Sequence, residues 1–234
     1  MTKPPLDAVL FDLDSTLCRY SLTVAEVIAQ AFERLGLEAS EIGSPEELEV
    51  DYNAAWWTAE DTLQLPTEEL RRRAWTALLA RRGTGDEALA RRIADAYSEI
   101  RDETGLELFE GMRPFLDALR PRYRTGILTN GPSDMQWGKL RGLELVDAVD
   151  VIVVAGDLGI FKPDPRPFCQ LLDALGVEAS RALFVGDSYE HDIVGAHRVG
   201  MKAAWIVNGH RPRPVDEPPD FVLARTTDLW EVLL

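Results

Sequence analysis

The first residues that could do chemistry stand at the end of a short apolar run near the start of the chain. The segment Ala8-Val-Leu-Phe-Asp-Leu13 is rich in apolar, β-branched and aromatic residues, which predicts a buried strand. It leads into an acidic turn that carries Asp12, Asp14, Ser15 and Thr16. The two carboxylates alone have little weight, because the chain contains 40 acidic residues and such a pair is often a solvated turn.

Polar side chains also follow three other predicted strands. Ligands of open α/β sheets bind outside the carboxyl ends of the strands, so residues at these ends are candidates for a site. They are Thr129, Asn130 and Gly131 after one strand, Lys162 after the next, and Gly186, Asp187, Ser188 and Asp192 after a third. Four acids, one lysine and one or two hydroxyls are therefore expected at one edge of a sheet.

A cluster of carboxylates at one edge predicts a bound cation, because like charges in close quarters raise one another's pKa. A hard divalent ion with oxygen ligands relieves that repulsion. Mg²⁺ suits a site with few carboxylates, water and a substrate phosphate. Lys162 and the Thr129 hydroxyl would then face the phosphoryl oxygens that the metal does not bind.

Each segment also has a plainer interpretation. Lys162-Pro-Asp-Pro165 is compatible with an ordinary loop, and Gly186-Asp-Ser188 with the capped start of a helix. Asp192 suits a helix N-terminus, and Asn130 suits a turn. All four segments nevertheless occur in order and at predicted strand ends, which favours a common site.

Together these segments resemble the motifs of the haloacid dehalogenase-like (HAD) superfamily. Asp12 to Thr16 resembles the first motif, Thr129 the second, Lys162 the third, and Gly186-Asp-Ser188 with Asp192 the fourth. Ser15 is a small departure, because many members have glycine there. The resemblance covers the whole α/β part, and it is closest to the C1-capped, phosphoglycolate phosphatase-like branch.

This resemblance implies a role for each motif residue. Asp12 would attack phosphorus to give an aspartyl-phosphate, and Asp14 would protonate the leaving alkoxide and then deprotonate water. Thr129, Asn130 and Lys162 would bind the phosphoryl group. Mg²⁺ would be held by the Asp12 carboxylate, the Asp14 backbone carbonyl and Asp187, with Ser188 and Asp192 in support. The dehalogenases of the superfamily lack an acid at the Asp14 position, because a halide leaves without a proton.

The resemblance predicts a phosphatase acting on a small phosphomonoester, and two alternatives stay open. A phosphomutase of the same fold would return the phosphoryl group to a bound sugar, but no residue between the first and second motifs identifies it. A binding or regulatory protein without turnover usually lacks a motif acid or the lysine, and this chain has them all. The particular substrate and the oligomeric state are not predicted.

The elements that must position these residues alternate between strand and helix from about residue 107 to the end. This order indicates βαβ units and a doubly wound, Rossmann-like parallel sheet of the α/β class, which also takes in the first strand. The predicted strands are Ala8–Leu13, Arg124–Thr129, Val149–Val153, Ala182–Val185, Ala203–Val207 and Asp220–Leu223. A short helix, Thr227–Leu234, is expected to close the chain.

The segment from Cys18 to about Gly105 is predicted to be helical throughout. Its apolar residues recur at helical spacing, and Ser44-Pro-Glu-Glu47 is a strong start signal for a helix. We expect a helical cap, 18–105, inserted into an α/β catalytic core that comprises 1–17 and 106–234.

Other residues of the inserted segment have simpler interpretations. Arg71–Arg73 and Arg81-Arg82 are expected on solvated helix faces, and Trp56-Trp57 in packing. Arg19 and Tyr20 are expected to pack where the chain passes into the cap, although contact with a substrate is an alternative.

Composition limits the partners. Apolar residues make up 46% of the 234 residues and the formal net charge is −15, which disfavours binding to nucleic acid or to an anionic membrane. No apolar run approaches the roughly 20 residues of a membrane span. Residues 1–6 do not resemble a signal peptide, so a cytoplasmic location is expected. Cys18 and Cys169 lie far apart, and we expect two half-buried thiols rather than a disulfide.

Overall fold

The computed structural model describes residues 6–58, 65–208 and 217–234. The first five residues, which contributed to the argument against a signal peptide, therefore lie outside the described part. The chain divides into an α/β unit, residues 1–19 and 107–234, and a helical unit, residues 20–106. The expected boundaries were one or two residues away, at 17/18 and 105/106. Each unit has its own core, and each is described by itself.

The α/β unit is built on a six-stranded parallel sheet with the order β5-β4-β1-β6-β7-β8. The strands are β1 (Ala8–Phe11), β4 (Arg124–Thr129), β5 (Val151–Val154), β6 (Ala182–Gly186), β7 (Lys202–Ile206) and β8 (Phe221–Leu223). β1 lies at the centre and is buried along its whole length, as expected for a parallel strand covered on both faces. The predicted α/β fold with a doubly wound parallel sheet is confirmed.

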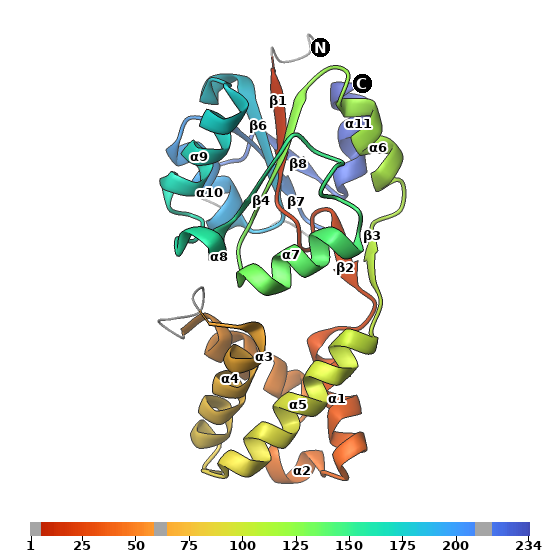
Figure 1. Ribbon diagram of the computed structural model, residues 1–234, viewed down its shortest axis with the longest axis vertical. Helices are drawn as coiled ribbons and strands as arrows, with labels where there is room; N and C mark the ends of the chain where they lie inside the picture. The colour runs from red at the N-terminus through yellow and green to blue at the C-terminus, as the bar shows by residue number, and fades with distance from the viewer. Residues whose placement is uncertain (1–5, 59–64, 209–216) are drawn as a thin grey trace. The chain divides into compact units, whose positions relative to one another are not determined.

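Helices cover both faces of this sheet (Figure 1). On one face α9 and α10 pack against the strands, while α6 and α11 lie on the other. The helices of the unit are α6 (Met112–Leu119), α7 (Ser133–Gly142), α8 (Ala155–Leu158), α9 (Pro165–Leu175), α10 (Val194–Arg198) and α11 (Trp230–Leu233). Short helical turns cover Ala179–Arg181, Tyr189–Ile193 and Thr226–Leu229, so the predicted terminal helix begins as a 3₁₀ turn.

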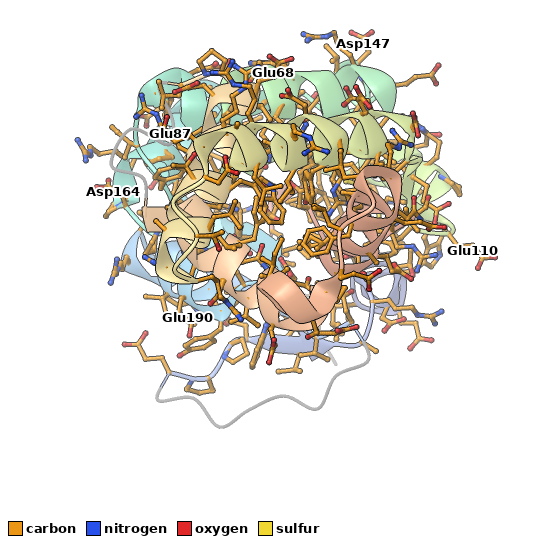
Figure 2. All side chains as sticks on the ribbon, turned by 90° about the horizontal axis from the view of Figure 1, so that it is seen from below. Glu68, Glu87, Glu110, Asp147, Asp164 and Glu190 are labelled. Carbon is orange, nitrogen blue, oxygen red and sulfur yellow. The ribbon has the colours of Figure 1, made fainter. Side chains whose placement is uncertain are left out.

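The helical unit contains α1 (Val24–Leu35), α2 (Ala39–Ile42), α3 (Pro45–Thr58), α4 (Thr67–Arg81) and α5 (Glu87–Glu103). The predicted start of α3 is confirmed, because Ser44 and Glu47 exchange side-chain to backbone hydrogen bonds. α1 begins with a similar capping box from Thr23 and ends at Gly36, which has φ 65°. The side chains of Glu68 and Glu87 lie on the outside of α4 and α5 (Figure 2).

One part of the secondary-structure prediction was wrong. Cys18–Tyr20 forms a short strand, β2, which pairs with β3 (Leu106–Leu108) where the chain passes between the units. Three residues are too few for a periodic pattern, so the sequence could not reveal this pairing. Arg19 forms an ion pair with Glu107, which agrees with a packing role in this connection.

The two cysteines also differ from the expectation that both would be half-buried. Cys18 is buried, Cys169 is exposed, and both are free. Among the described residues, no helix combines the length and the apolar composition that crossing a membrane requires.

Candidate active site

The candidate site lies at the carboxyl ends of β1, β4 and β6. β1 pairs with β4 on one side and with β6 on the other, and Phe11 lies opposite both Ile127 and Val185. The residues that follow Phe11 therefore lie between those that follow the two neighbouring strands. This order brings Asp12 and Asp14 between Thr129 and Asp187, because parallel strands end at the same edge of a sheet.

Lys162 is the buried cation of this edge. Its Nζ lies 2.7 Å from Asp12 Oδ1 and 2.6 Å from Asp192 Oδ1. Lys162 is 2% exposed and Asp192 is 1% exposed. A charge so deeply buried is tolerated only when it is paired and hydrogen-bonded, and two carboxylates satisfy that need here. The sequence placed these three residues on separate strand ends, and the structure brings them into contact.

Two features of the loop after β6 hold the Asp192 carboxylate in place. The backbone N–H of Ser188 donates to Asp192 Oδ2 at 3.0 Å, while the Ser188 hydroxyl accepts from His191 N and caps a π-helical turn. The carboxylate also packs directly on Gly186, where a Cβ atom would overlap it. Glycine is therefore needed at this position for close approach, and Ser188 has a supporting role.

Asp12, Asp187 and Asp192 form the candidate metal site. One carboxylate oxygen from each lies within 4.8 Å of the others. Burial, against the opposing charge of Lys162, raises the pKa of Asp12 to about 7. Burial and the charges of Asp12 and Asp192 raise the pKa of Asp187 to about 8. Three crowded carboxylates, two of which have raised pKa values, suit a hard divalent cation, which would stabilise the ionised oxygens.

The Asp14 carboxylate is outside this cluster and has its own cation. Lys139 Nζ lies 2.7 Å from Asp14 Oδ1 and 2.8 Å from Oδ2, and Gln136 Nε2 donates to Oδ2 at 2.9 Å. Lys139 is itself buried. Burial pushes the pKa of Asp14 upward, but the charge and hydrogen bond of Lys139, with the Gln136 bond, outweigh it and lower the pKa. Asp14 is thus ionised in this arrangement.

Gln136 links Asp14 to the end of β4. Its amide nitrogen lies 2.6 Å from Thr129 Oγ1 and 2.5 Å from the Asn130 carbonyl oxygen, in addition to the Asp14 contact. The Thr129 hydroxyl is buried in this network. Three acceptors share two amide hydrogens, so the amide cannot donate fully to all of them at once. A substrate oxygen that replaces one acceptor leaves the amide its other two contacts.

The Asn130 side chain contacts the backbone of Lys162, and its contact with a phosphate stays a prediction. Its side chain accepts from the Lys162 backbone N–H at 2.9 Å and donates to the Lys162 carbonyl at 3.1 Å. Both ends of the amide are thus engaged with the lysine loop. α9 begins three residues beyond the lysine, with Asp164 as N-cap and Pro165 at its first position, which fixes the other side of the loop.

The turn after Asp14 shows why many family members have glycine at the position of Ser15, and how serine is held there. Ser15 has φ 60°, in the left-handed region where glycine carries no steric penalty. The Ser15 N–H donates to the Cys18 carbonyl, and its own carbonyl accepts from Asn208. These bonds hold a serine in a conformation that most residues avoid.

A comparison with protein-family models decides the assignment. The model described as haloacid dehalogenase-like hydrolase matches residues 6–200, which include every motif residue of the site. The chain belongs to this family. The resemblance predicted from the motifs is therefore confirmed.

Curated relatives of this HAD-like hydrolase include several phosphatases. A phosphoserine phosphatase of Thermus thermophilus is 37% identical over 62% of this chain, and the match spans only 57% of that relative's length. A glyceraldehyde 3-phosphate phosphatase of Methanopyrus kandleri is 30% identical over 97% of both chains. The names of these relatives describe enzymes that act on different small phosphomonoesters.

Solved structures include both phosphatase-like and dehalogenase members. A 2-haloacid dehalogenase of Pseudomonas syringae is 31% identical and has a TM-score of 0.65. The match covers 97% of this chain and 98% of the dehalogenase. The HAD-hydrolase YfnB of Bacillus subtilis, bound to magnesium, has a TM-score of 0.75 at 22% identity, with 97% and 98% covered. The likeness to YfnB, at 22% identity, supports the fold alone.

Two residues of the site, Gln136 and Lys139, were missed by the sequence analysis. Only residues within a few positions of each strand end were considered there, and both lie further on, in α7. A signal was nevertheless available, since Gln136 and Lys139 are three residues apart and so share a face of the helix that directly follows Thr129. Most basic residues of this chain are arginines, so a lysine one helix beyond the second motif is a further sign of a functional position.

Proposed function

We propose that this HAD-like hydrolase is a magnesium-dependent phosphatase that cleaves a small phosphomonoester through an aspartyl-phosphate on Asp12. The observation that carries the proposal is the convergence of Asp12, Asp187 and Asp192 within 4.8 Å, with buried Lys162 bound to two of them. A nucleophilic carboxylate beside a cation-binding cluster and a fixed ammonium group suits attack on a dianionic phosphate.

In the first step a carboxylate oxygen of Asp12 forms a bond to phosphorus, and the bond from phosphorus to the alkoxy oxygen breaks. Asp14 supplies the proton that the leaving alkoxide takes up. In the second step water attacks phosphorus, Asp14 takes the proton, and the Asp12 carboxylate is released with inorganic phosphate. One difficult displacement is thereby divided into two easier ones.

The Asp14–Lys139 pair suits the second step as it stands, because an ionised carboxylate accepts a proton. For the first step Asp14 must carry a proton. A phosphate dianion placed beside it disfavours its ionised form and so raises its pKa. Lys139 then limits how far the pKa rises and fixes the direction of the carboxylate. We infer that Lys139 is a positioning residue for Asp14.

The residues fit a resident Mg²⁺ held by Asp12 and Asp187 with Asp192 in support, as well as by the Asp14 backbone carbonyl that the family resemblance implies. When bound, the ion would neutralise charge on the phosphoryl oxygens and organise the carboxylates. Lys162 neutralises further charge, and Thr129 offers a hydroxyl to a phosphoryl oxygen. Asn130 holds the Lys162 loop, so its role is positioning.

The substrate class rests on the two phosphatase relatives, which are named for phosphoserine and glyceraldehyde 3-phosphate. A net charge of −15 gives no support to nucleic acid or an anionic membrane as partner. The similar 2-haloacid dehalogenase makes dehalogenation the second candidate. Release of halide needs no proton, so that reaction gives Asp14 no role as a general acid.

The test is a screen of phosphorylated metabolites and p-nitrophenyl phosphate with Mg²⁺, together with 2-chloropropionate as the dehalogenase probe. We expect phosphate release from at least one ester and no chloride release. Asp12→Asn should abolish turnover, whereas Asp117→Asn, which changes an exposed acid of α6, should leave it unchanged. Borohydride reduction during turnover should convert Asp12 to homoserine, detectable by peptide mass. Chloride release without phosphate release would replace the proposal.

A further inference from the structure

The helical unit contains two buried arginines for which the proposed reaction gives no role. Arg71, in α4, and Arg101, in α5, are each 8% exposed. Arg71 was expected on a solvated face, and that expectation was wrong. It follows Leu70 and shares a helix face with Ala74 and Leu78, so the pattern places it on the apolar side.

Neither arginine has a carboxylate partner among the residues that the structure describes. Arg101 donates to the Leu22 carbonyl at 2.8 Å and to the Tyr97 hydroxyl at 3.2 Å. Its guanidinium lies 4.5 Å from the centre of the Tyr20 ring. Arg71 lies 5.7 Å from the centre of the Tyr97 ring. Arg101 therefore makes two hydrogen bonds and ring contacts, while Arg71 makes a ring contact, and neither is paired with a carboxylate in the described residues.

The exposed arginines of the same unit behave in the opposite way. Four of them form ion pairs with acids: Arg34 with Glu99 and Glu103, Arg72 with Glu68 and Asp95, Arg73 with Glu69, and Arg82 with Glu47 and Asp51. Glu68 and Glu87 lie on the outside of α4 and α5 (Figure 2). Acids are thus abundant around these helices, yet none in the described part of the chain reaches the buried pair.

Tyrosines connect the two arginines. The Tyr52 ring lies 5.0 Å from that of Tyr97 and 5.4 Å from that of Trp75. Both guanidinium groups lie over the Tyr97 ring, Arg71 at 5.7 Å and Arg101 at 5.5 Å from its centre. The cluster therefore offers two cations and two hydroxyls, with no opposing charge in the described residues.

Burying a cation without a partner costs free energy, and a bound anion would remove that cost. The Arg71 nitrogens also remain open to a ligand. The buried side-chain polar atoms that are sealed from solvent without a partner, within the described residues, belong to Thr16, Arg72, Trp75 and Gln136. The Arg71 nitrogens are not among them, and they donate no hydrogen bond to the described residues, so they are accessible to solvent.

We propose that Arg71 and Arg101 bind the carboxylate or phosphate group of a small molecule within the helical unit. The planar guanidinium of Arg71 would donate to two anionic oxygens, and Arg101 with the tyrosine hydroxyls would complete the site. A small acidic molecule that binds to the helical unit by itself has this chemistry.

Binding is tested on the full chain with malonate, succinate and citrate at constant ionic strength, by calorimetry and by fluorescence of the tryptophans. We expect at least one acid to bind to the wild type. Arg71→Gln should weaken it roughly 10- to 100-fold, the factor that charge-assisted hydrogen bonds provide. Arg73→Gln, an exposed arginine of the same helix, is the matched control and should leave binding unchanged.

Arg71→Lys keeps the charge and removes the planar fork, so it serves if Arg71→Gln fails to fold. It should weaken carboxylate binding less than Arg71→Gln does. The proposal is overturned if no acid binds to the wild type, or if both Arg71 variants bind as tightly as Arg73→Gln. The binding experiment needs no turnover, so its failure and the failure of the phosphatase proposal are separable.

Discussion

The α/β unit and the helical unit both bury positive charge, and they do so in opposite surroundings. In the α/β unit Lys162 contacts Asp12 and Asp192, and Lys139 contacts Asp14. In the helical unit Arg71 and Arg101 contact rings, a hydroxyl and a carbonyl. The first arrangement has more carboxylates than cations, and the second has cations alone.

This difference indicates which ligand each unit lacks. Asp187 adds a third carboxylate to Asp12 and Asp192, and the raised pKa values of Asp12 and Asp187 show that one lysine does not balance them. The α/β unit therefore suits a cation. The arginine pair has an excess of positive charge and suits an anion. A buried charge is tolerated when its partner arrives, whether that partner is a side chain or a ligand.

The largest expected effect comes from removing the paired cation of the α/β unit. Lys162→Met leaves Asp12 and Asp192 buried without their partner, which should cost about 3–5 kcal/mol in the free energy of unfolding. Turnover should fall at least about 10³-fold, because a fixed charge on the transferring group is lost. Urea unfolding and phosphate release measure the two effects. A stability change below about 1 kcal/mol would show that the pair is not the dominant interaction.

The next effect concerns the second buried pair, Lys139 and Asp14. Lys139→Met should lower kcat for an alkyl phosphate by about 10²-fold, the scale of general acid–base catalysis. Turnover of p-nitrophenyl phosphate should fall much less, because its leaving group departs without a proton. Lys139→Arg should restore part of the alkyl activity. Equal losses on both esters would instead indicate a general structural defect.

Removal of metal should reveal the unbalanced acids of the α/β unit. The pKa values of Asp12 and Asp187, raised to about 7 and about 8, lie above their unfolded value of about 3.8. These two groups bind more protons in the folded, metal-free protein, so their contribution to stability is fully present below about pH 4 and is lost as pH rises through about 7 to 8.

Mg²⁺ should reverse that loss. At 100 times its Kd the ion would add about 2.7 kcal/mol, or a rise in Tm of roughly 5–10 °C, at pH 8. At pH 5.5 protons compete with the metal and the rise should be smaller. Thermal unfolding with EDTA and with Mg²⁺ measures the difference, and Asp187→Asn should respond less. An equal rise at both pH values would contradict the assigned carboxylates.

The smallest effect is expected in the helical unit. Arg71 has no acid partner in the described part of the chain, so Arg71→Met should change the free energy of unfolding by less than about 1 kcal/mol, the scale of its contact with the Tyr97 ring. Urea unfolding without added anions is the measurement. A loss as large as that of Lys162→Met would show that Arg71 has an unrecognised partner, and the contrast between the units would not hold.

Much of the candidate site could be predicted because it depends on local signals. Asp12 and Asp187 directly follow strands with a clear apolar pattern, Thr129 ends another, and parallel strands must end at one edge. Lys162 and Asp192 lie only a short way beyond such ends. The family resemblance depended on these segments and is confirmed by the family comparison.

Other features depend on neighbours that are distant in the sequence. Lys139 lies 125 residues from the carboxylate it contacts, and nothing within α7 shows which side chain it faces. Asn130 was expected at a phosphate, but its amide is engaged with the backbone of Lys162, 32 residues away. The β2–β3 pair is too short to have a pattern.

The sequence by itself determined the α/β class, the strand ends and the acids that follow them, because periodicity and turn chemistry act over a few residues. Only the tertiary structure decided which cation each carboxylate meets, and that Arg71 is buried while Arg73 is paired at the surface. The physical reason is that a charge is stabilised or destabilised by everything within a few ångströms, and packing alone sets what lies there.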